Sequence, residues 1–292
     1  MKNHRARVCG TLLWLFPLLL PPAGATTYEE ALARSQDFAS LPASTNLLTL
    51  TYDQLITTNY AGTTYLKAVT LMKGSTWSNF YLPYVGWTST RSNSVGYETW
   101  VTFEPELKGY MTVRTNEFDV SSAASIAGRA EQALGMTNNA THLFAVDLWV
   151  AVEGLFRPAI NWTLTNSATY CDWTGQDVNG PDWFGSVYGE NYYSWFTNRQ
   201  ATIYSGSGAF PWTGLGYTFD WYYPTNSLAL IGLSEFVIGA QQTYYVGGGT
   251  PVDQFFAVPE PGVGVLILLG LLVLRPLRIR LRATHGRMPN VH

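Results

Sequence analysis

The C-terminal segment, residues 258–292, most restricts what this chain of 292 residues can fold into. Twelve Val, Gly, Leu and Ile residues at 263–274 run directly into a basic cluster, Arg275, Arg278, Arg280 and Arg282. Arginine is almost never buried without a partner, so a globular core cannot absorb this segment. An apolar run with a basic flank instead predicts a membrane-inserted segment whose basic end faces the cytoplasm.

The apolar run is short for a permanent anchor. A helix of twelve residues spans about 18 Å, whereas the hydrocarbon layer of a bilayer is ~30 Å thick. An ordinary anchor would therefore need flanking residues and arginines that extend toward the interface. A transient hold before cleavage requires less, so the sequence leaves both the anchored and the released form open.

Pro259, Glu260 and Pro261 stand immediately before the apolar run. Together with this run and the arginine cluster, they resemble the PEP-CTERM sorting tail of bacterial proteins that exosortase transpeptidases process. The polar extension 283–292 departs from the pattern, because such tails usually stop soon after the arginines. The resemblance implies an exosortase-type partner, and a location at the cell surface or in the extracellular matrix of a Gram-negative-type bacterium.

The N-terminus also carries an export pattern. Lys2, Arg5 and Arg7 precede an apolar run at 11–20, and small residues end at Ala25. This pattern predicts a signal peptide, cleaved by signal peptidase after Ala25. The predicted organisation is a signal peptide at 1–25, an exported domain at 26–246, a flexible Gly-rich linker at 247–257 and the sorting segment at 258–292.

The exported part has a different charge balance from the whole chain. Eight of the seventeen Lys and Arg residues lie in the two terminal segments, so residues 26–257 hold nine basic and nineteen acidic residues, a net charge of -10. Such a surface repels phosphate backbones within a Debye length of about 8 Å, which argues against a nucleic-acid partner. About 230 residues suffice for one domain with a sizeable core.

Residue patterns predict an α+β fold with a predominantly antiparallel sheet, a few helices, an N-terminal signal helix and a C-terminal hydrophobic helix. Thr27 and Glu30 have the spacing of a capping box, which predicts a short helix that ends before Leu41. A second helix is expected at 122–134, where Gly135 supplies a left-handed cap. Alternating apolar residues predict strands at 48–52, 97–103, 111–113, 143–152, 217–223 and 234–238.

Candidate catalytic groups are few, and we predict no catalytic residue and no resident cofactor. His142 is the only histidine between residues 26 and 257, and no Gly-x-Ser-x-Gly motif accompanies it. A single histidine before a strand is typical of a surface position. Asp172, Asp177 and Asp182 crowd one loop and are oxygen ligands of the kind that Ca²⁺ takes, although a solvated acidic turn is the preferred explanation.

Aromatic residues are dense between 170 and 223, where seventeen of 54 residues are Phe, Trp or Tyr. Exposed rings of this kind could stack on sugar faces, and Trp183 and Trp195, in irregular sequence, are the candidates for glycan contact. The alternative is that the rings pack a core poor in Leu and Ile. That alternative is preferred for Tyr217, Phe219 and Trp221, which alternate as core residues do.

Several sequence segments of the exported part resemble those of an uncharacterised bacterial family. They are residues 100–107, 129–135, 155–158, 211–221 and 232–238. The resemblance implies a single unit from about residue 45 to 240 and carries no activity. It makes Arg157, Asp220 and Glu235 the polar candidates. The expected function is structural or glycan-binding; the alternative is a carboxylate-dependent secreted enzyme such as a glycosidase, in which Asp220 and Glu235 would form the acid/base pair.

Overall fold

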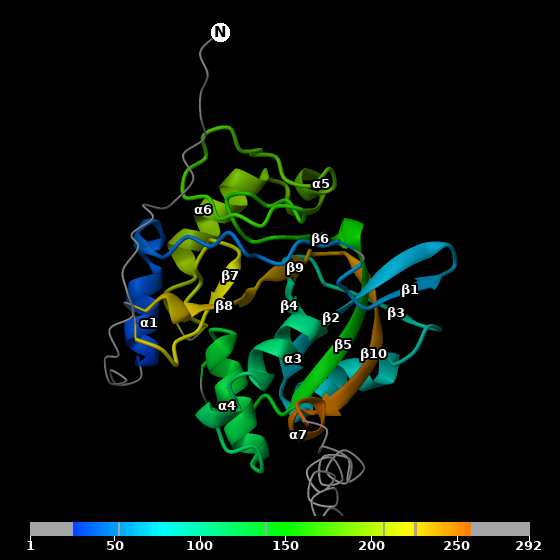
Figure 1. Ribbon diagram of the computed structural model, residues 1–292. Coiled ribbons are helices and arrows are strands. Elements are labelled where there is room, and N and C mark those ends of the chain that lie inside the picture. Colours follow the sequence, from blue (N-terminus) through cyan, green and yellow to red (C-terminus); the bar gives the residue numbers. More distant parts are fainter. Residues whose placement is uncertain (1–25, 52, 138, 207, 225–226, 258–292) are drawn as a thin grey trace, which may run out of the picture. The chain divides into compact units, whose positions relative to one another are not determined.

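The computed structural model describes residues 26–257, apart from 52, 138, 207, 225 and 226. The predicted signal peptide and the sorting segment, including Pro259, Glu260, Pro261 and the four arginines, lie outside the described residues. The described chain forms a compact unit that ends at Phe256 and has an α+β architecture, as predicted (Figure 1). No helix in this part of the chain is both long and apolar enough to cross a membrane.

A large antiparallel sheet organises the unit. Its two long inner strands, β2 (Thr63–Met72) and β5 (Phe144–Ala151), pair over eight residues. The sheet order is β3-β10-β5-β2-β4-β9-β6, and β1 also pairs with β2. The bounds of the other strands are β1 (Thr57–Tyr60), β3 (Thr90–Ser92), β4 (Thr99–Phe103), β6 (Leu155–Phe156), β9 (Phe236–Ile238) and β10 (Thr243–Pro251).

The sheet buries apolar side chains on both faces. Alternate residues of β2 and β5, among them Leu66 and Leu148, pack on one face with Trp77 of the π-helix η2 (Trp77–Tyr81). Val69 and Ala145 point to the other face. There they meet α3 (Glu104–Thr112), α4 (Ala123–Ala133) and α7 (Val252–Phe255), which Figure 1 shows together on one side of the sheet.

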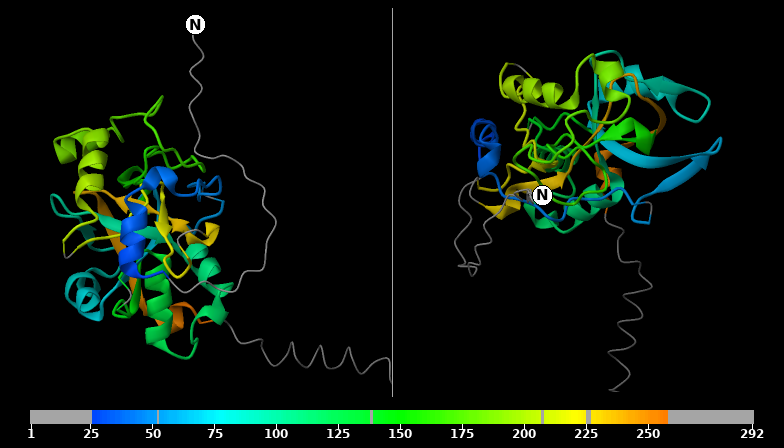
Figure 2. Two further views of the ribbon diagram at one scale, coloured as in Figure 1. Left: turned by 90° about the vertical axis from the view of Figure 1, so that its left-hand side faces the viewer. Right: turned by 90° about the horizontal axis from the view of Figure 1, so that it is seen from above.

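Two smaller clusters complete the core. The helix α1 (Tyr28–Ser35) packs on a two-stranded sheet of β7 (Tyr217–Phe219) and β8 (Ile231–Ser234). Aromatic rings join α5 (Phe184–Tyr188) and α6 (Tyr192–Thr202) to the edge of the large sheet (Figures 1 and 2). Short helical turns lie at Phe38–Ser40, Gly74–Thr76, Leu82–Tyr84, Thr115–Glu117, Val152–Gly154 and Leu228–Leu230.

Local signals of the sequence are confirmed where they act within one turn. The Thr27 side chain accepts a hydrogen bond from Glu30 N, and the Glu30 carboxylate accepts one from Thr27 N, so the capping box forms. Ser122 caps α4, and Gly135 beyond its end has a φ of 70°. The predicted strand at 143–152 is β5, in the interior of the sheet.

Four strand predictions need correction. The strand predicted at 217–223 ends at Phe219 as β7. Residues 48 and 50 lie outside any strand, because Leu50 N bonds to Leu164 O in a neighbouring loop. Residues 111 and 112 end α3 and Val113 is its C-cap; the start of this helix is favoured by Pro105 and by two glutamates in its first turn. The segment 234–238 is divided at Glu235, since β8 pairs with β7 and β9 pairs with β4 and β6.

The predicted flexible linker at 247–257 is also wrong. Gly248, Gly249 and Thr250 pair with β5 as part of β10, and α7 follows. A Cβ atom at Gly249 would lie 2.6 Å from the indole ring of Trp77. Glycine at this position therefore reflects a ring packed against the strand, and the domain extends to Phe256 instead of ending at 246.

We predict that Gly249→Ala lowers the free energy of unfolding by about 1 to 3 kcal/mol, because the added methyl overpacks the Trp77 contact. Gly248→Ala is the matched control, since a Cβ there meets nothing within 4 Å. Urea unfolding of both variants is the measurement. Equal and negligible losses would mean that β10 does not pack on Trp77.

Candidate functional site

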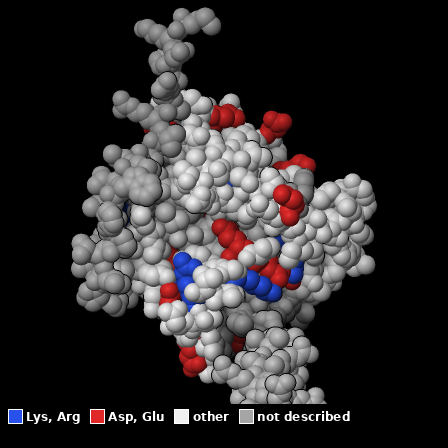
Figure 3. All heavy atoms as spheres, viewed as in Figure 1, with Lys and Arg blue, Asp and Glu red and all other residues white. Residues whose placement is uncertain are grey.

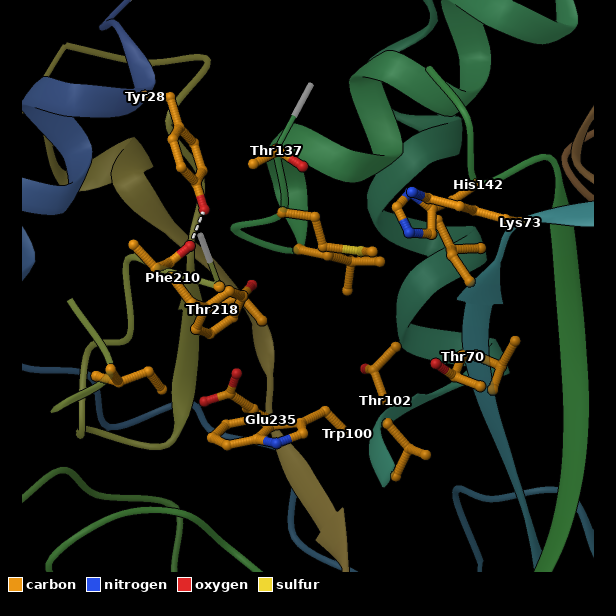
Figure 4. A pocket seen from close by; sticks show the side chains of 18 of the residues that line it. Tyr28, Thr70, Lys73, Trp100, Thr102, Thr137, His142, Phe210, Thr218 and Glu235 are labelled. Carbon is orange, nitrogen blue, oxygen red and sulfur yellow. Dashed lines mark hydrogen bonds between the residues drawn. The ribbon is translucent and has the colours of Figure 1, made fainter. Parts of the chain in front are cut away.

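A pocket lies where two neighbouring strands of the large sheet separate. β4 pairs with β2 only through Phe103 and Thr102, and its other residues pair with β9. The gap is bordered by the last residues of β2, the end of α4, α6 and residues 208–210. It encloses a volume of about 500 Å³ (Figure 4).

The pocket wall is amphipathic. Trp100 and Phe210 form an aromatic corner, with ring centroids 5.8 Å apart, and Leu71 and Met136 add aliphatic surface. Polar groups interrupt this wall at separate points. They are Thr70, Lys73, Thr102, Thr137, His142, Arg199, Thr218 and Glu235. An apolar wall with a few placed polar groups is typical of a site for a small organic molecule.

Glu235 is the most unusual polar group of the pocket. It sits between β8 and β9, where its backbone N–H donates to Gly216 O at 3.0 Å. Its side chain extends into the cavity in Figure 4, yet the residue is only 3% exposed, and Oε2 has no hydrogen-bond partner in the described part of the chain. Burial raises the pKa of this carboxyl well above its ordinary 4.5, although the indole of Trp212 and the charge of Arg157 oppose the shift. The raised pKa favours the protonated carboxyl, which can both donate and accept a hydrogen bond.

Arg157 supports Glu235 from behind the pocket. Its guanidinium is buried, donates to Gly216 O at 3.2 Å and to Leu48 O at 2.7 Å, and lies 4.7 Å from the Phe236 ring centroid. Burial lowers the pKa of Arg157 to about 10, opposed by the nearby Glu106, Tyr192 and Glu235. The group remains positive at neutral pH. It does not line the pocket, but it bonds to the same carbonyl, Gly216 O, that accepts the Glu235 N–H.

His142 contributes a histidine–carboxylate pair to the same pocket. Its Nδ1 lies 2.7 Å from Oε1 of Glu131, a fully buried residue of α4. The Glu131 carboxylate also accepts the backbone N–H groups of residues 139–142 at 2.8 to 3.0 Å. Burial raises the pKa of Glu131, but these bonds outweigh it and the net pKa is lowered. His142 is thus held by a charged carboxylate in the pocket wall, rather than on the open surface that its sequence suggested.

Asp220 does not share the pocket with Glu235. Its carboxylate is fully buried and receives both terminal nitrogens of Arg129, at 2.7 and 3.1 Å, together with the Tyr110 hydroxyl. Arg129 also pairs with Glu117 at 2.7 Å. Asp220 therefore holds α4 to the segment after β7. The acid/base pair expected for a glycosidase is not formed by these two carboxyls.

The predicted glycan contacts are placed differently from the expectation. Trp195 is 5% exposed, and its Nε1 donates to Glu98 at 3.0 Å, so the expectation of a surface ring is wrong. Trp195 lies on the buried side of α6, where Tyr192 and Phe196 also pack into the core. Trp183 is half-buried, donates to Glu153 O and packs its ring against Phe184.

The acidic loop makes local turns. Asp172 accepts the N–H of Thr174, and Asp177 that of Asn179, each at 2.9 Å. Within the described residues, no three His, Cys, Asp or Glu side chains are grouped as they would be around a metal ion. The calcium site at Asp172, Asp177 and Asp182 stays a prediction.

A comparison with protein families, curated proteins and solved structures found no match for this chain. The chemistry of the pocket is therefore the basis for a functional assignment.

Sequence reasoning missed three pocket groups: Trp100, Phe210 and the Glu131 partner of His142. One signal was present for Glu131. It shares the inward side of α4 with Ala127 and Ala130, and a glutamate on the apolar side of a helix requires a buried partner. Trp100 and Phe210 carried no such signal, because their pairing joins segments 110 residues apart.

The pH dependence of stability tests the state of Glu235. Because its pKa is raised on folding, its contribution to stability is full below the unfolded pKa of about 4.5 and is lost as the pH rises through the folded pKa. Glu235→Gln removes the titrating group, and with it this pH-dependent loss of stability, while keeping the shape of the side chain. We expect the unfolding free energy of wild type, relative to that of the variant, to fall as the pH rises above the ordinary pKa of 4.5 in urea titrations. A difference that does not change with pH would mean a solvated carboxyl.

Proposed function

We propose that this chain is an exported protein of the cell surface or extracellular matrix that binds a neutral sugar unit in the Glu235 pocket. The observation that carries the proposal is the buried carboxyl of Glu235, which extends into an amphipathic cavity with one oxygen unpartnered. A buried polar atom without a partner costs about 1 to 3 kcal/mol, and a ligand hydroxyl that satisfies it recovers this cost.

A sugar matches the two kinds of wall. Its ring hydroxyls both donate and accept, which suits the carboxyl of Glu235 and the hydroxyls of Thr102 and Thr218. Its C–H faces are apolar and suit the ring surfaces of Trp100 and Phe210. The volume of about 500 Å³ lies within the range of small-molecule sites.

The proposed location rests on both ends of the sequence. The signal pattern at 1–25 and the tail at 258–292 support export by signal peptidase and sorting by an exosortase-type enzyme, with the membrane as a transient or lasting partner. The net charge of -10 on residues 26–257 favours a neutral ligand over an anionic polymer or nucleic acid.

A secreted enzyme is the second candidate, and one observation favours it. The pocket holds a buried carboxyl, Glu235, and a histidine held by a carboxylate, His142, on separate walls (Figure 4). Carboxyl and imidazole groups are the side chains most often used for general acid and base catalysis. Glu235 is the only carboxylate among the described lining residues, so this candidate lacks the second carboxyl of an ordinary glycosidase.

We expect Trp100→Ala and Glu235→Ala to abolish binding of the same small neutral sugar, measured on a glycan array with the full chain purified in detergent. Glu235→Gln is the control, because its amide still donates and accepts, and it should retain most of the binding. If wild type and Trp100→Ala are both folded and bind the sugar equally, the pocket is not the sugar-binding site.

The sorting tail has its own test. Replacing Pro259, Glu260 and Pro261 together with alanine should leave export intact and stop processing, since the motif stands just outside the apolar run. Cell fractionation and the mass of the mature chain are the readouts. A mutant that reaches the same fraction at the same mature mass as wild type would favour a plain membrane anchor.

A further inference from the structure

Five aromatic side chains gather on one face of the large sheet, and we call this group the aromatic patch. They come from β1, β2, the loop before β3, β5 and β10. The members are Tyr60, Tyr65, Trp87, Trp149 and Tyr245. None of them lines the Glu235 pocket.

Trp87 is the centre of the patch and contacts each of the other four rings. Its centroid lies 4.8 Å from that of Tyr60 in a stacked arrangement and 4.7 Å from that of Tyr245. The corresponding distances to Tyr65 and Trp149 are 5.6 and 5.8 Å. The patch is therefore one contiguous surface, although its members are far apart in the sequence.

The patch faces outward. Leu66, Val150, Tyr244 and Val246, the neighbours of patch residues along the strands, are buried, so the alternating residues between them point away from that core. Tyr60 is 38% exposed and the other four are half-buried. The helices α3, α4 and α7 cover the opposite end of this face, and the β1–β2 hairpin projects beyond them (Figures 1 and 2).

The rings are held in place before any ligand arrives. The Tyr60 hydroxyl donates to Trp87 O at 3.2 Å. A Cβ atom at Gly247 would lie 2.7 Å from Nε1 of Trp149, so the absence of a side chain lets this indole lie against β10. Fixed rings lose little conformational entropy on binding, which favours affinity.

We propose that the aromatic patch binds a neutral polysaccharide chain. All five members are Tyr or Trp, which combine an apolar face with a polar edge. Residues 56–66 carry no charge, and Figure 3 shows the surface over the hairpin without charged side chains. Lys67, the cross-strand partner of Trp149, is paired with Asp147 at 3.0 Å. The choice of a sugar polymer rests on the proposed glycan-binding function, but the residues are separate from the pocket.

Affinity electrophoresis tests the proposal with the full chain in mild detergent. The gels contain hydroxyethyl cellulose, xyloglucan or galactomannan as neutral polymers, and alginate as an acidic comparison. We expect at least one neutral polymer to retard wild type, and Tyr60→Ala to weaken this binding about fivefold or more, since one ring contact is lost. Tyr97→Ala, which removes an exposed tyrosine outside the patch, should behave as wild type.

Trp87→Phe is a second variant that is less prone to misfolding, because it keeps an aromatic ring at the centre of the patch. Since this ring is smaller, the retardation of Trp87→Phe should lie between those of wild type and Tyr60→Ala. The proposal is overturned if no neutral polymer retards wild type, if alginate alone does, or if Tyr60→Ala is retarded like Tyr97→Ala. A change of sedimentation from dimer to monomer in Tyr60→Ala, with retardation unchanged, would assign the patch to self-association. The two proposals can fail separately. If only the pocket proposal is wrong, the pocket variants bind small sugars as wild type does or no small sugar binds, while neutral polymers still retard the protein through the patch.

Discussion

The buried guanidinium of Arg157 is the interaction on which the arrangement around the pocket depends. It joins the segment at Leu48, the turn at Gly216 and strand β9 through two carbonyl bonds and the ring of Phe236. Gly216 has a φ of 81°, and a Cβ there would lie 2.6 Å from Cδ of Arg157. A buried charge is tolerated only with partners, and here they are carbonyl dipoles together with the nearby Glu106 and Glu235.

This arrangement fixes the point at which the chain passes from the small sheet to the large one. β8 ends at Ser234, whose N–H donates to the Glu106 carboxylate at 2.9 Å, and β9 begins at Phe236. Glu235, between them, belongs to neither strand, and its side chain extends into the gap between β2 and β4 (Figure 4). Burial in that place raises the pKa of the carboxyl and so favours its protonated form, which suits the pocket to uncharged polar ligands.

The sequence predicted those parts of the fold that short-range chemistry decides. The capping box at Thr27, the cap at Gly135 and the alternation of β5 each depend on neighbours within a few residues. The glycines of β10 suggested a linker, but Gly247 and Gly249 leave room for the rings of Trp149 and Trp77, which come from distant segments. Of the polar candidates, Arg157 and Glu235 are brought close together, but Asp220 belongs to an ion pair with Arg129 that no spacing in the sequence reveals.

Site-specific carbon NMR of the Glu235 carboxyl, followed across a pH titration of the full chain in detergent, tests whether the pocket carboxyl has a raised pKa and binds sugar. We predict that this carboxyl is still protonated well above its ordinary pKa of 4.5, and that a bound neutral sugar shifts its resonance. Titration at the ordinary value, with no response to any sugar, would contradict it, because the carboxyl would then be solvated and the pocket would lack its defining group.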